Sequence, residues 1–139
     1  MGRSTHDIAL ATVAAAVLSG MPGTTWTVLT GGDLLESTRA AATLLPGQRD
    51  NPTTAGGIAA HFGMSTGWTL VLSRVIPSRG AKVGAAVGAV AGLAIAALDM
   101  GVIAKRHFPA MAALPQIPQY ADHVAFGAIA GAILGRRAR

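Results

Sequence analysis

The chain has 139 residues, no cysteine and a formal net charge of +5; hydrophobic residues make up 51% of it and charged residues only 12%. Soluble proteins carry roughly 25% charged residues, so this composition argues against an ordinary soluble domain, and the lack of cysteine excludes disulfides and thiolate metal sites. The eleven Lys and Arg residues lie at the ends of apolar runs rather than on one face, which favours anionic lipid over nucleic acid as a partner.

The first apolar run covers about residues 8–30. It is long enough to cross a hydrocarbon layer of roughly 30 Å, which takes about 20 helical residues. Pro22, in the segment GMPG, removes a backbone donor and predicts a kink or break there. A signal peptide is the competing interpretation, since Arg3 precedes an apolar stretch that ends in small residues. We favour a span because the hydrophobicity continues past Gly23.

A short amphipathic helix is expected next, over about residues 33–45. Asp33 and Glu36 have the spacing of a capping box, and Pro46 closes the segment. The apolar residues fall on one helical face, which is typical of a helix lying at the membrane interface.

Three further apolar runs predict spans over about residues 54–76, 83–105 and 120–135. The last is short for a full crossing, and tilt, local thinning or shielding by other helices would accommodate it. The expected fold is an all-α integral membrane four-helix bundle, with a Pro-kinked first span and one interfacial helix, in a single transmembrane domain over residues 1–139. Three spans and a partial one are the alternative.

The positive charges predict the orientation of this bundle. Seven Lys or Arg residues flank the spans on one side and four on the other, and the richer side is expected to be cytoplasmic. Both termini would then face the cytoplasm of a bacterial inner membrane. The seven are Arg3, Arg74, Arg79, Lys82, Arg136, Arg137 and Arg139, and the four are Arg39, Arg49, Lys105 and Arg106.

Glycines recur at every fourth position in three of the predicted spans. Such spacing lets a neighbouring helix pack closely against backbone. The sequence leaves open whether these stripes join helices of one chain or of different subunits, and a thin bundle of small-residue helices favours a homo-oligomer. The glycines are Gly63 and Gly67, Gly84, Gly88 and Gly92, and Gly127, Gly131 and Gly135.

Polar residues of separate spans fall at a similar depth below the predicted outer surface. Asp99 lies roughly 9 Å and His61 roughly 10 Å below it, at about 1.5 Å per helical residue, and Asp122 and His123 lie in the first turn of the last span. A buried carboxylate is costly unless paired, and intramembrane ionisable groups normally face protein or water. We therefore expect Asp99 to face inward, towards His61, His123 or both.

An outward-facing pocket around these residues is the predicted ligand or proton site. Its candidate residues are Asp99, His61, His123, Ser65, Trp68, Trp26, Thr25 and Asp122. Structural alternatives remain open for most of them. The Asp99–histidine pair would lock helix register, and His61 would donate to a backbone carbonyl. His123 would lie in the headgroup region, and Asp122 would be interfacial, as a cap for the last helix. Trp68 would face lipid, and Trp26 would anchor the interface.

Three uses of such a pocket compete. A histidine and a carboxylate can relay protons or couple them to a solute. Asp99, His61 and His123 also suit a divalent metal such as zinc, without a diagnostic spacing. A lipid, quinone or other hydrophobic ligand beside the Pro22 break is the third. The motifs GxxxxGK[ST], HExxH and GxSxG are absent, so no cofactor is identified and a non-enzymatic role is favoured.

Three stretches carry a resemblance: HFGMSTGW, LDMGV and the closing DHVAFGAIAGAILG. The chain resembles small uncharacterised membrane proteins of actinobacterial type and is more distantly similar to YagU-type inner-membrane proteins of unknown function. The resemblance implies a small multi-span integral membrane protein and transfers no activity or site residue.

The preferred interpretation is a membrane protein that binds or passes a small solute, ion or proton through the Asp/His pocket. The alternative is a non-catalytic accessory subunit or assembly factor that docks on a larger membrane complex through its glycine-rich seams. An enzyme acting on lipid is a third option. Expected partners are membrane lipids and either further copies of the chain or a larger membrane complex.

Overall fold

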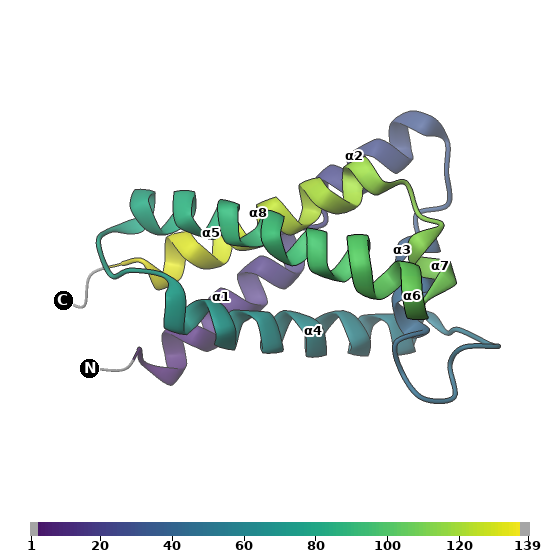
Figure 1. Cartoon of the computed structure of the whole chain (residues 1–139), viewed down its shortest axis with the longest axis horizontal. Coiled ribbons are helices and arrows are strands. Elements are labelled where there is room, and N and C mark those ends of the chain that lie inside the picture. Colours follow the sequence, from purple (N-terminus) through teal and green to yellow (C-terminus); the bar gives the residue numbers. More distant parts are fainter. Residues whose placement is uncertain (1–2, 137–139) are drawn as a thin grey trace.

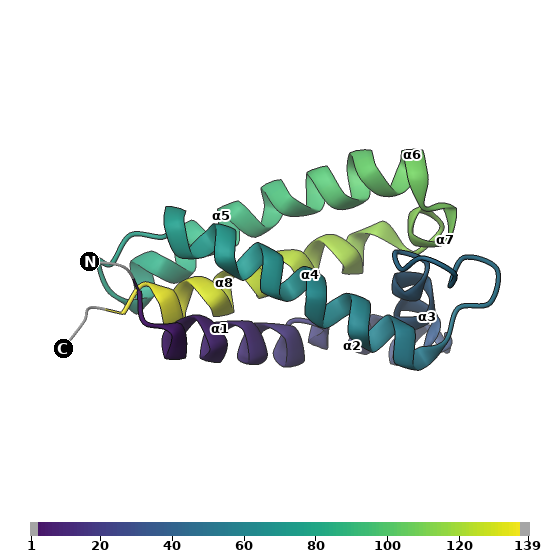
Figure 2. The same cartoon turned by 90° about the horizontal axis from the view of Figure 1, so that it is seen from below.

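The computed structural model describes residues 3–136, and all regular secondary structure in that range is helical. Long helices run side by side along the molecule, and the start of α1 and the end of α8 lie at the same end (Figures 1 and 2). We call this the terminal end and the opposite one, with α3, α6 and α7, the distal end. The helices are α1 (Thr5–Leu18), α2 (Met21–Thr30), α3 (Glu36–Ala42), α4 (Thr54–Val75), α5 (Ala81–Leu98), the π-helical segment η1 (Asp99–Ala104), α6 (Lys105–His107), α7 (Pro109–Ala112) and α8 (Gln116–Leu134).

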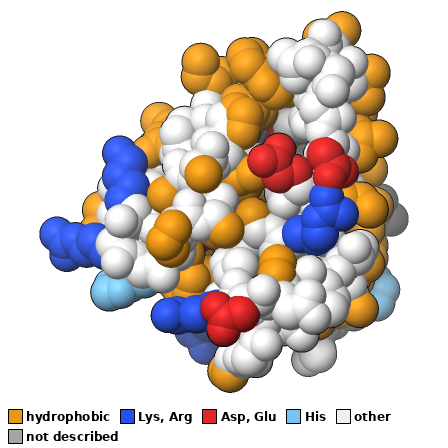
Figure 3. Space-filling model, turned by 90° about the vertical axis from the view of Figure 1, so that its right-hand side faces the viewer, with side chains coloured by type: hydrophobic (Ala, Val, Ile, Leu, Met, Phe, Trp, Pro, Cys, Tyr) orange, Lys and Arg blue, Asp and Glu red, His pale blue; other side chains and the backbone are white. Residues whose placement is uncertain are grey.

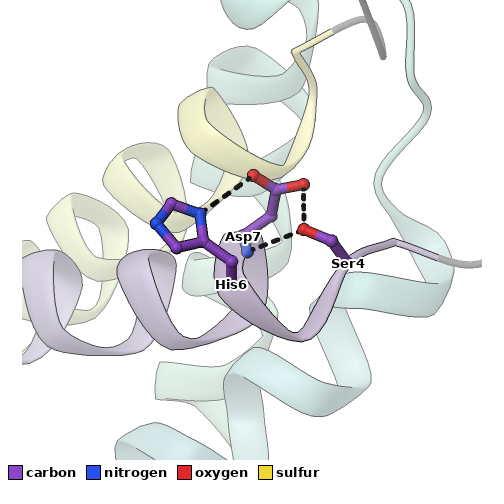
Figure 4. A network of polar contacts seen from close by, with 3 residues as sticks. All are labelled: Ser4, His6 and Asp7. Atoms are coloured by element: carbon purple, nitrogen blue, oxygen red, sulfur yellow. Dashed lines mark hydrogen bonds and ion pairs between the residues drawn. The ribbon is translucent and has the colours of Figure 1, made fainter.

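The helix α1 begins at a local cap (Figure 4). Ser4 Oγ accepts the Asp7 backbone N–H at 3.1 Å and donates to Asp7 Oδ2 at 2.7 Å, and His6 Nδ1 lies 3.9 Å from Asp7 Oδ1. These bonds satisfy an N–H group that has no partner inside the helix. The break expected at Pro22 is present: α1 ends at Leu18, and Pro22 lies in the first turn of α2.

The helix expected over residues 33–45 is shorter than predicted. Regular helix covers Glu36–Ala42 rather than residues 33–45, and the capping box does not form, because the N-cap residue is Leu35. Asp33 Oδ1 instead accepts the Leu35 backbone N–H at 2.8 Å, and Asp33 also pairs with Arg39. The Leu35 hydrogen bond, followed by the Arg39 charge, lowers the pKa of Asp33 below its usual value.

Two segments are long and apolar enough to cross a membrane: Thr5–Thr30, with a mean hydropathy of 1.5, and Ala81–His107, with a mean hydropathy of 2.1. Length and composition alone carry this finding. Within residues 3–136, α4 and α8 do not combine the length and apolar composition that a span needs, although the sequence predicts a span in each. Their polar residues explain this: α4 contains His61 and Arg74 among several hydroxyls, and α8 begins with glutamines and the pair Asp122–His123.

Large apolar side chains are exposed along α1, α4 and α5, and α8 exposes Ile117 in its first turn. Val17 is 63% exposed, Leu70 is 40%, Val90 is 71% and Ile117 is 74% exposed. Monomeric soluble proteins rarely expose extended apolar surface. This surface is compatible with contact to lipid chains.

The glycines of α5 and α8 face each other. A Cβ at Gly88 would overlap the Gly127 carbonyl oxygen, and a Cβ at Gly127 would overlap that of Gly88. Gly84 packs in the same way against Gly131, and Gly92 packs against the backbone of His123. The two triple stripes therefore join two helices of one chain. Gly63 and Gly67 differ, because a Cβ at either position would meet nothing within 4 Å.

The terminal end holds the tightly packed part of the core. Ala11, Ala15, Leu72, Ile76, Ala130 and Leu134 are buried there, with Ile95 and Phe126 towards the middle of the molecule. Arg3 ties helix ends together, since its guanidinium donates to the carbonyls of Leu134, at 2.8 Å, Ser73 and Ile76. It thereby satisfies carbonyls that lack partners at the ends of α8 and α4.

Basic side chains lie at both ends of the molecule, and most of the acidic ones lie towards the distal end. Of the seven expected on one side, Arg3, Arg74, Arg79, Lys82 and Arg136 lie at the terminal end, while Arg137 and Arg139 fall outside the described residues. The distal end mixes both signs (Figure 3). Its charged residues are Arg39, Arg49, Lys105, Arg106, Asp33, Glu36 and Asp50.

Candidate functional site

A cavity of about 580 Å³ lies in the distal half, between α4 and the continuous helix α5–η1, with α8 as a third wall. Its volume is within the range usual for ligand pockets, about 300–1,000 Å³. Residues of α2, α3 and the α1–α2 break complete its lining. From the long helices the lining includes Ile58, His61, Phe62, Ser65, Trp68, Ile95, Asp99, Met100, Ile103, Gln119, Asp122, His123 and Phe126.

The backbone changes at Asp99. The α-helix α5 ends at Leu98 and continues as the six-residue π-helical segment η1, which starts with Asp99. A π-helical turn contains more residues than an α-helical one, and such turns occur frequently at functional sites. Here Asp99 faces the cavity with 14% of its side chain exposed, while the neighbouring Met100 is 1% exposed.

One carboxylate oxygen of Asp99 contacts two side chains from other helices. The indole Nε1–H of Trp68 donates to Asp99 Oδ2 at 2.9 Å, and Nε2 of His123 lies 3.7 Å from the same oxygen. These contacts link α4, η1 and α8. The other oxygen, Oδ1, receives no hydrogen bond from residues 3–136. It is also not one of the fully buried polar atoms that lack a partner in that range. Oδ1 is therefore accessible to solvent, and Asp99 is one of the residues that line the cavity.

The second ring nitrogen of His123 defines the protonation of this pair. Nδ1 lies 2.7 Å from the Gln119 carbonyl oxygen, which can only accept, so Nδ1 carries a hydrogen. Nε2 is thus the nitrogen that gains or loses a proton next to Asp99. Attraction between the two side chains requires one proton between them, either on the imidazole or on the carboxyl. The pair therefore holds one exchangeable proton.

His61 lines the same cavity but does not pair with Asp99. Its Nε2 lies 2.8 Å from the Ala16 carbonyl oxygen and donates to it. Ala16 is in the last turn of α1, where the break before Pro22 leaves carbonyls without partners inside the helix. The structural alternative for His61, a bond to a backbone carbonyl, is thus the one found. In its neutral form Nδ1 remains an acceptor.

Asp122 caps a helix other than its own. The expectation that it caps the last helix is wrong, because the N-cap residue of α8 is Pro115. Asp122 Oδ1 instead accepts the Gly23 backbone N–H at 2.7 Å, in the first turn of α2. A negative charge is favourable at a helix N-terminus, where N–H groups lack partners.

Most of the predicted site residues meet at this cavity, and two do not. Asp99, His61, His123, Ser65, Trp68 and Asp122 all line it. Trp26 is 39% exposed and lines a smaller cavity of about 80 Å³, and Thr25 is exposed and lines neither of these two cavities. The suggested metal set is not assembled, since no group of three His, Asp or Glu side chains within residues 3–136 is placed to hold an ion.

Sequence reasoning missed the aromatic part of the cavity. Phe62, Phe108 and Phe126 line it together with Trp68. A weak signal existed in the sequence: Phe62 follows His61 directly, and Phe126 lies three residues after His123, on the same helical face. Phe108 lies between α6 and α7, in a proline-interrupted segment whose helices the periodicity of apolar residues does not indicate.

Comparison with protein-family models, with curated proteins and with solved structures found no match to this chain. The geometry of the cavity is therefore the basis for assigning a function.

Proposed function

We propose that this chain is a multi-span membrane protein that binds a small ligand in the cavity, with the Asp99–His123 pair as its polar anchor. The single observation that carries the proposal is the convergence of polar side chains from three helices on one large, mainly apolar cavity. Such a combination is typical of ligand sites.

We propose that α4 and α8 cross the membrane together with the two apolar segments, which gives four spans. Thr5–Thr30 and Ala81–His107 have the length and composition of spans. α8 packs backbone to backbone along α5, and α4 lies alongside α1 (Figures 1 and 2). Their polar residues His61, Asp122 and His123 all line the cavity. With the basic terminal end in the cytoplasm, the cavity belongs to the outer half of the membrane.

Binding is favoured over passage because the cavity is blind towards the terminal end. Ile95 and Phe126 line it on that side and also belong to the packed core. Beyond them lie the buried Leu72 and Leu134 and the close α5–α8 contact. A solute that enters from the distal half meets a closed core.

Filling the cavity tests this function. Ile103→Trp would place a large side chain into the cavity, whereas Val102→Trp, its neighbour in η1, adds the same side chain at a position that is 41% exposed. The full chain, purified in mild detergent, is expected to carry a small molecule detectable by mass spectrometry. The Val102 variant should retain that molecule and the Ile103 variant should lose it. Equal retention by both variants would contradict the proposal.

An accessory role is the second candidate, and one observation favours it. Gly63 and Gly67 form an open small-residue face on α4, next to the exposed Leu70. The α5 and α8 stripes are used within the chain, so docking on a partner or a further copy would use this α4 face. Gly63→Leu would then abolish co-purification or reduce the oligomeric mass, whereas Ala97→Leu, at an exposed position on α5, would not. An unchanged mass and partner set in both variants would exclude this role for the face.

A further inference from the structure

We infer that the ligand of this cavity is a lipophilic organic cation: an amine, quaternary ammonium or similar positive group carried on an apolar or aromatic body. This inference rests on the proposed binding function and specifies its ligand class. Three features of the lining support it: the aromatic side chains, the sign of the charged groups, and the open oxygen of Asp99.

Aromatic residues are concentrated at the cavity. The whole chain has six Phe, Trp and Tyr residues, and Phe62, Trp68, Phe108 and Phe126 line this one site. Aromatic faces attract cations through the ring quadrupole, most strongly where water is excluded. One ring already shows this preference, since the Arg49 guanidinium lies 5.5 Å from the Phe108 ring centroid.

The charged lining groups disfavour an anion. Asp99 and Asp122 line the cavity, and no Lys or Arg is among its lining residues in the described chain. The parts of α2, α3 and the α1–α2 break that line it contribute no titratable side chain. A ligand carboxylate or phosphate would meet two carboxylates and no Lys or Arg from the described lining, which disfavours its binding.

Asp99 offers a free acceptor to such a cation. Its Oδ2 is used by Trp68 and His123, while Oδ1 is accessible and has no protein donor among the described residues, and Asp99 lines the cavity. An ammonium group or another positive centre next to Oδ1 would be paired with the carboxylate charge, in a cavity that four aromatic side chains help to line. A neutral ligand would use the same oxygen only through a hydrogen bond.

The cation competes with a proton. A protonated His123 neutralises Asp99, and a second positive charge next to Asp99 favours loss of that proton from Nε2. The titratable groups that face His123 are Asp99 on η1, His61 on α4 and Asp122 on its own helix. One positive charge enters as one proton leaves, so cation binding should tighten as the pH rises.

Two hydrophobic ions of nearly equal shape and opposite charge test the inference: tetraphenylphosphonium and tetraphenylborate. The chain offers its own reporter, since Trp68 lies in the cavity and Trp26 outside it. In a Trp26→Phe background, the full chain in detergent is titrated with each ion and Trp68 fluorescence is followed. Neutral triphenylphosphine oxide is the third probe, and a Trp68→Phe variant, which leaves Trp26, measures non-specific partition into the micelle.

We expect saturable quenching by the phosphonium, at least about tenfold tighter than by the borate; tenfold corresponds to about 1.4 kcal/mol. Asp99→Asn should remove this preference, because the amide keeps the shape and the acceptor for Trp68 but not the charge. Asp50→Asn, the same change at an exposed loop position, should leave it intact.

Borate binding as tight as phosphonium binding, or saturable binding of the neutral probe alone, would overturn the cation inference while leaving the binding function standing. Absence of saturable binding by all three probes also overturns it. If the Ile103→Trp variant then retains the same co-purified molecules as the wild type, the binding function fails as well.

Discussion

The Asp122 carboxylate accepts a hydrogen bond from the backbone N–H of Gly23, a residue 99 positions earlier in the chain. The bond joins α8 to the start of α2, directly after the break that Pro22 imposes. The break exposes an N–H group, and a side chain from another helix satisfies it.

Loss of this cap should destabilise the fold. We expect Asp122→Ala to lower the free energy of unfolding by about 1 kcal/mol, the usual cost of removing a helix N-cap. Thermal unfolding of the purified chain in detergent measures it. Asp50→Ala, at an exposed loop position, serves as the control. Equal melting temperatures for the two variants would show that the Gly23 bond contributes nothing.

The two kinds of glycine in the long helices should respond in opposite ways to the same substitution. Gly88→Ala places a Cβ against the Gly127 carbonyl oxygen, and such overpacking typically costs about 1–3 kcal/mol. Gly63→Ala places its Cβ in open space and gains the higher helix propensity of alanine, so it should be neutral or stabilising. Melting temperatures of the two variants in one detergent decide the matter. A stabilised Gly88→Ala variant would mean that α5 and α8 are further apart than described.

Arg3 should stabilise the terminal end through the helix carbonyls it binds. Arg3→Met keeps the apolar stem and removes the guanidinium that donates to Leu134, Ser73 and Ile76. Hydrogen bonds to a charged group contribute about 1.5–3 kcal/mol, so a clear drop in melting temperature is expected. Arg79→Met removes an exposed charge at the same end and should change it little. Equal melting temperatures of the two variants would show that the Arg3 contacts do not contribute to the stability of the fold.

The pH dependence of cation binding should follow His123. Phosphonium affinity is therefore expected to increase as the pH is raised through the range in which the His123 imidazole loses its proton, and to level off above that range. His123→Gln should flatten the profile, and His107→Gln, an exposed histidine on α6, should not. A profile that falls with rising pH would contradict competition between the proton and the cation.

The orientation can be tested because the chain has no native cysteine. A single cysteine introduced by Asn51→Cys lies in the distal loop, and one introduced by Ser78→Cys lies in the turn between α4 and α5 at the terminal end. A membrane-impermeant maleimide should label the first in intact cells and the second only after lysis. Labelling of both in intact cells would refute the four-span topology with cytoplasmic termini.

Local sequence patterns were informative wherever a single residue type forces the structure. Pro22 lacks the donor that an uninterrupted helix needs, and the break is there. Glycines four residues apart marked the faces of α5 and α8 that meet, because no other residue permits that approach. Asp99 was expected to face inward, since a carboxylate among apolar residues needs a partner, and it lies at the cavity beside His123.

Features that depend on tertiary contacts were missed. The π-helical turn at Asp99 has no sequence signature, because the same residues would also form a continuous α-helix. The His61 bond to Ala16 depends on a carbonyl released in a different helix. The start of α3 was misplaced because Asp33 binds Leu35 and Arg39 instead of completing a capping box. The His61 bond is formed between segments and the Asp33 bonds within one segment, and the periodicity of apolar residues indicates neither.

The glycine contact between α5 and α8 has a mechanical consequence. Two backbones in direct contact have no side-chain layer to rearrange, so this pair forms a stiff spine. Across the cavity, α4 touches the η1 side chiefly through the Trp68–Asp99 bond and otherwise packs on α1, α3 and, less extensively, α8. Entry of a ligand would therefore move α4 relative to the rigid α5–α8 pair. That movement would break the hydrogen bond between Trp68 and Asp99.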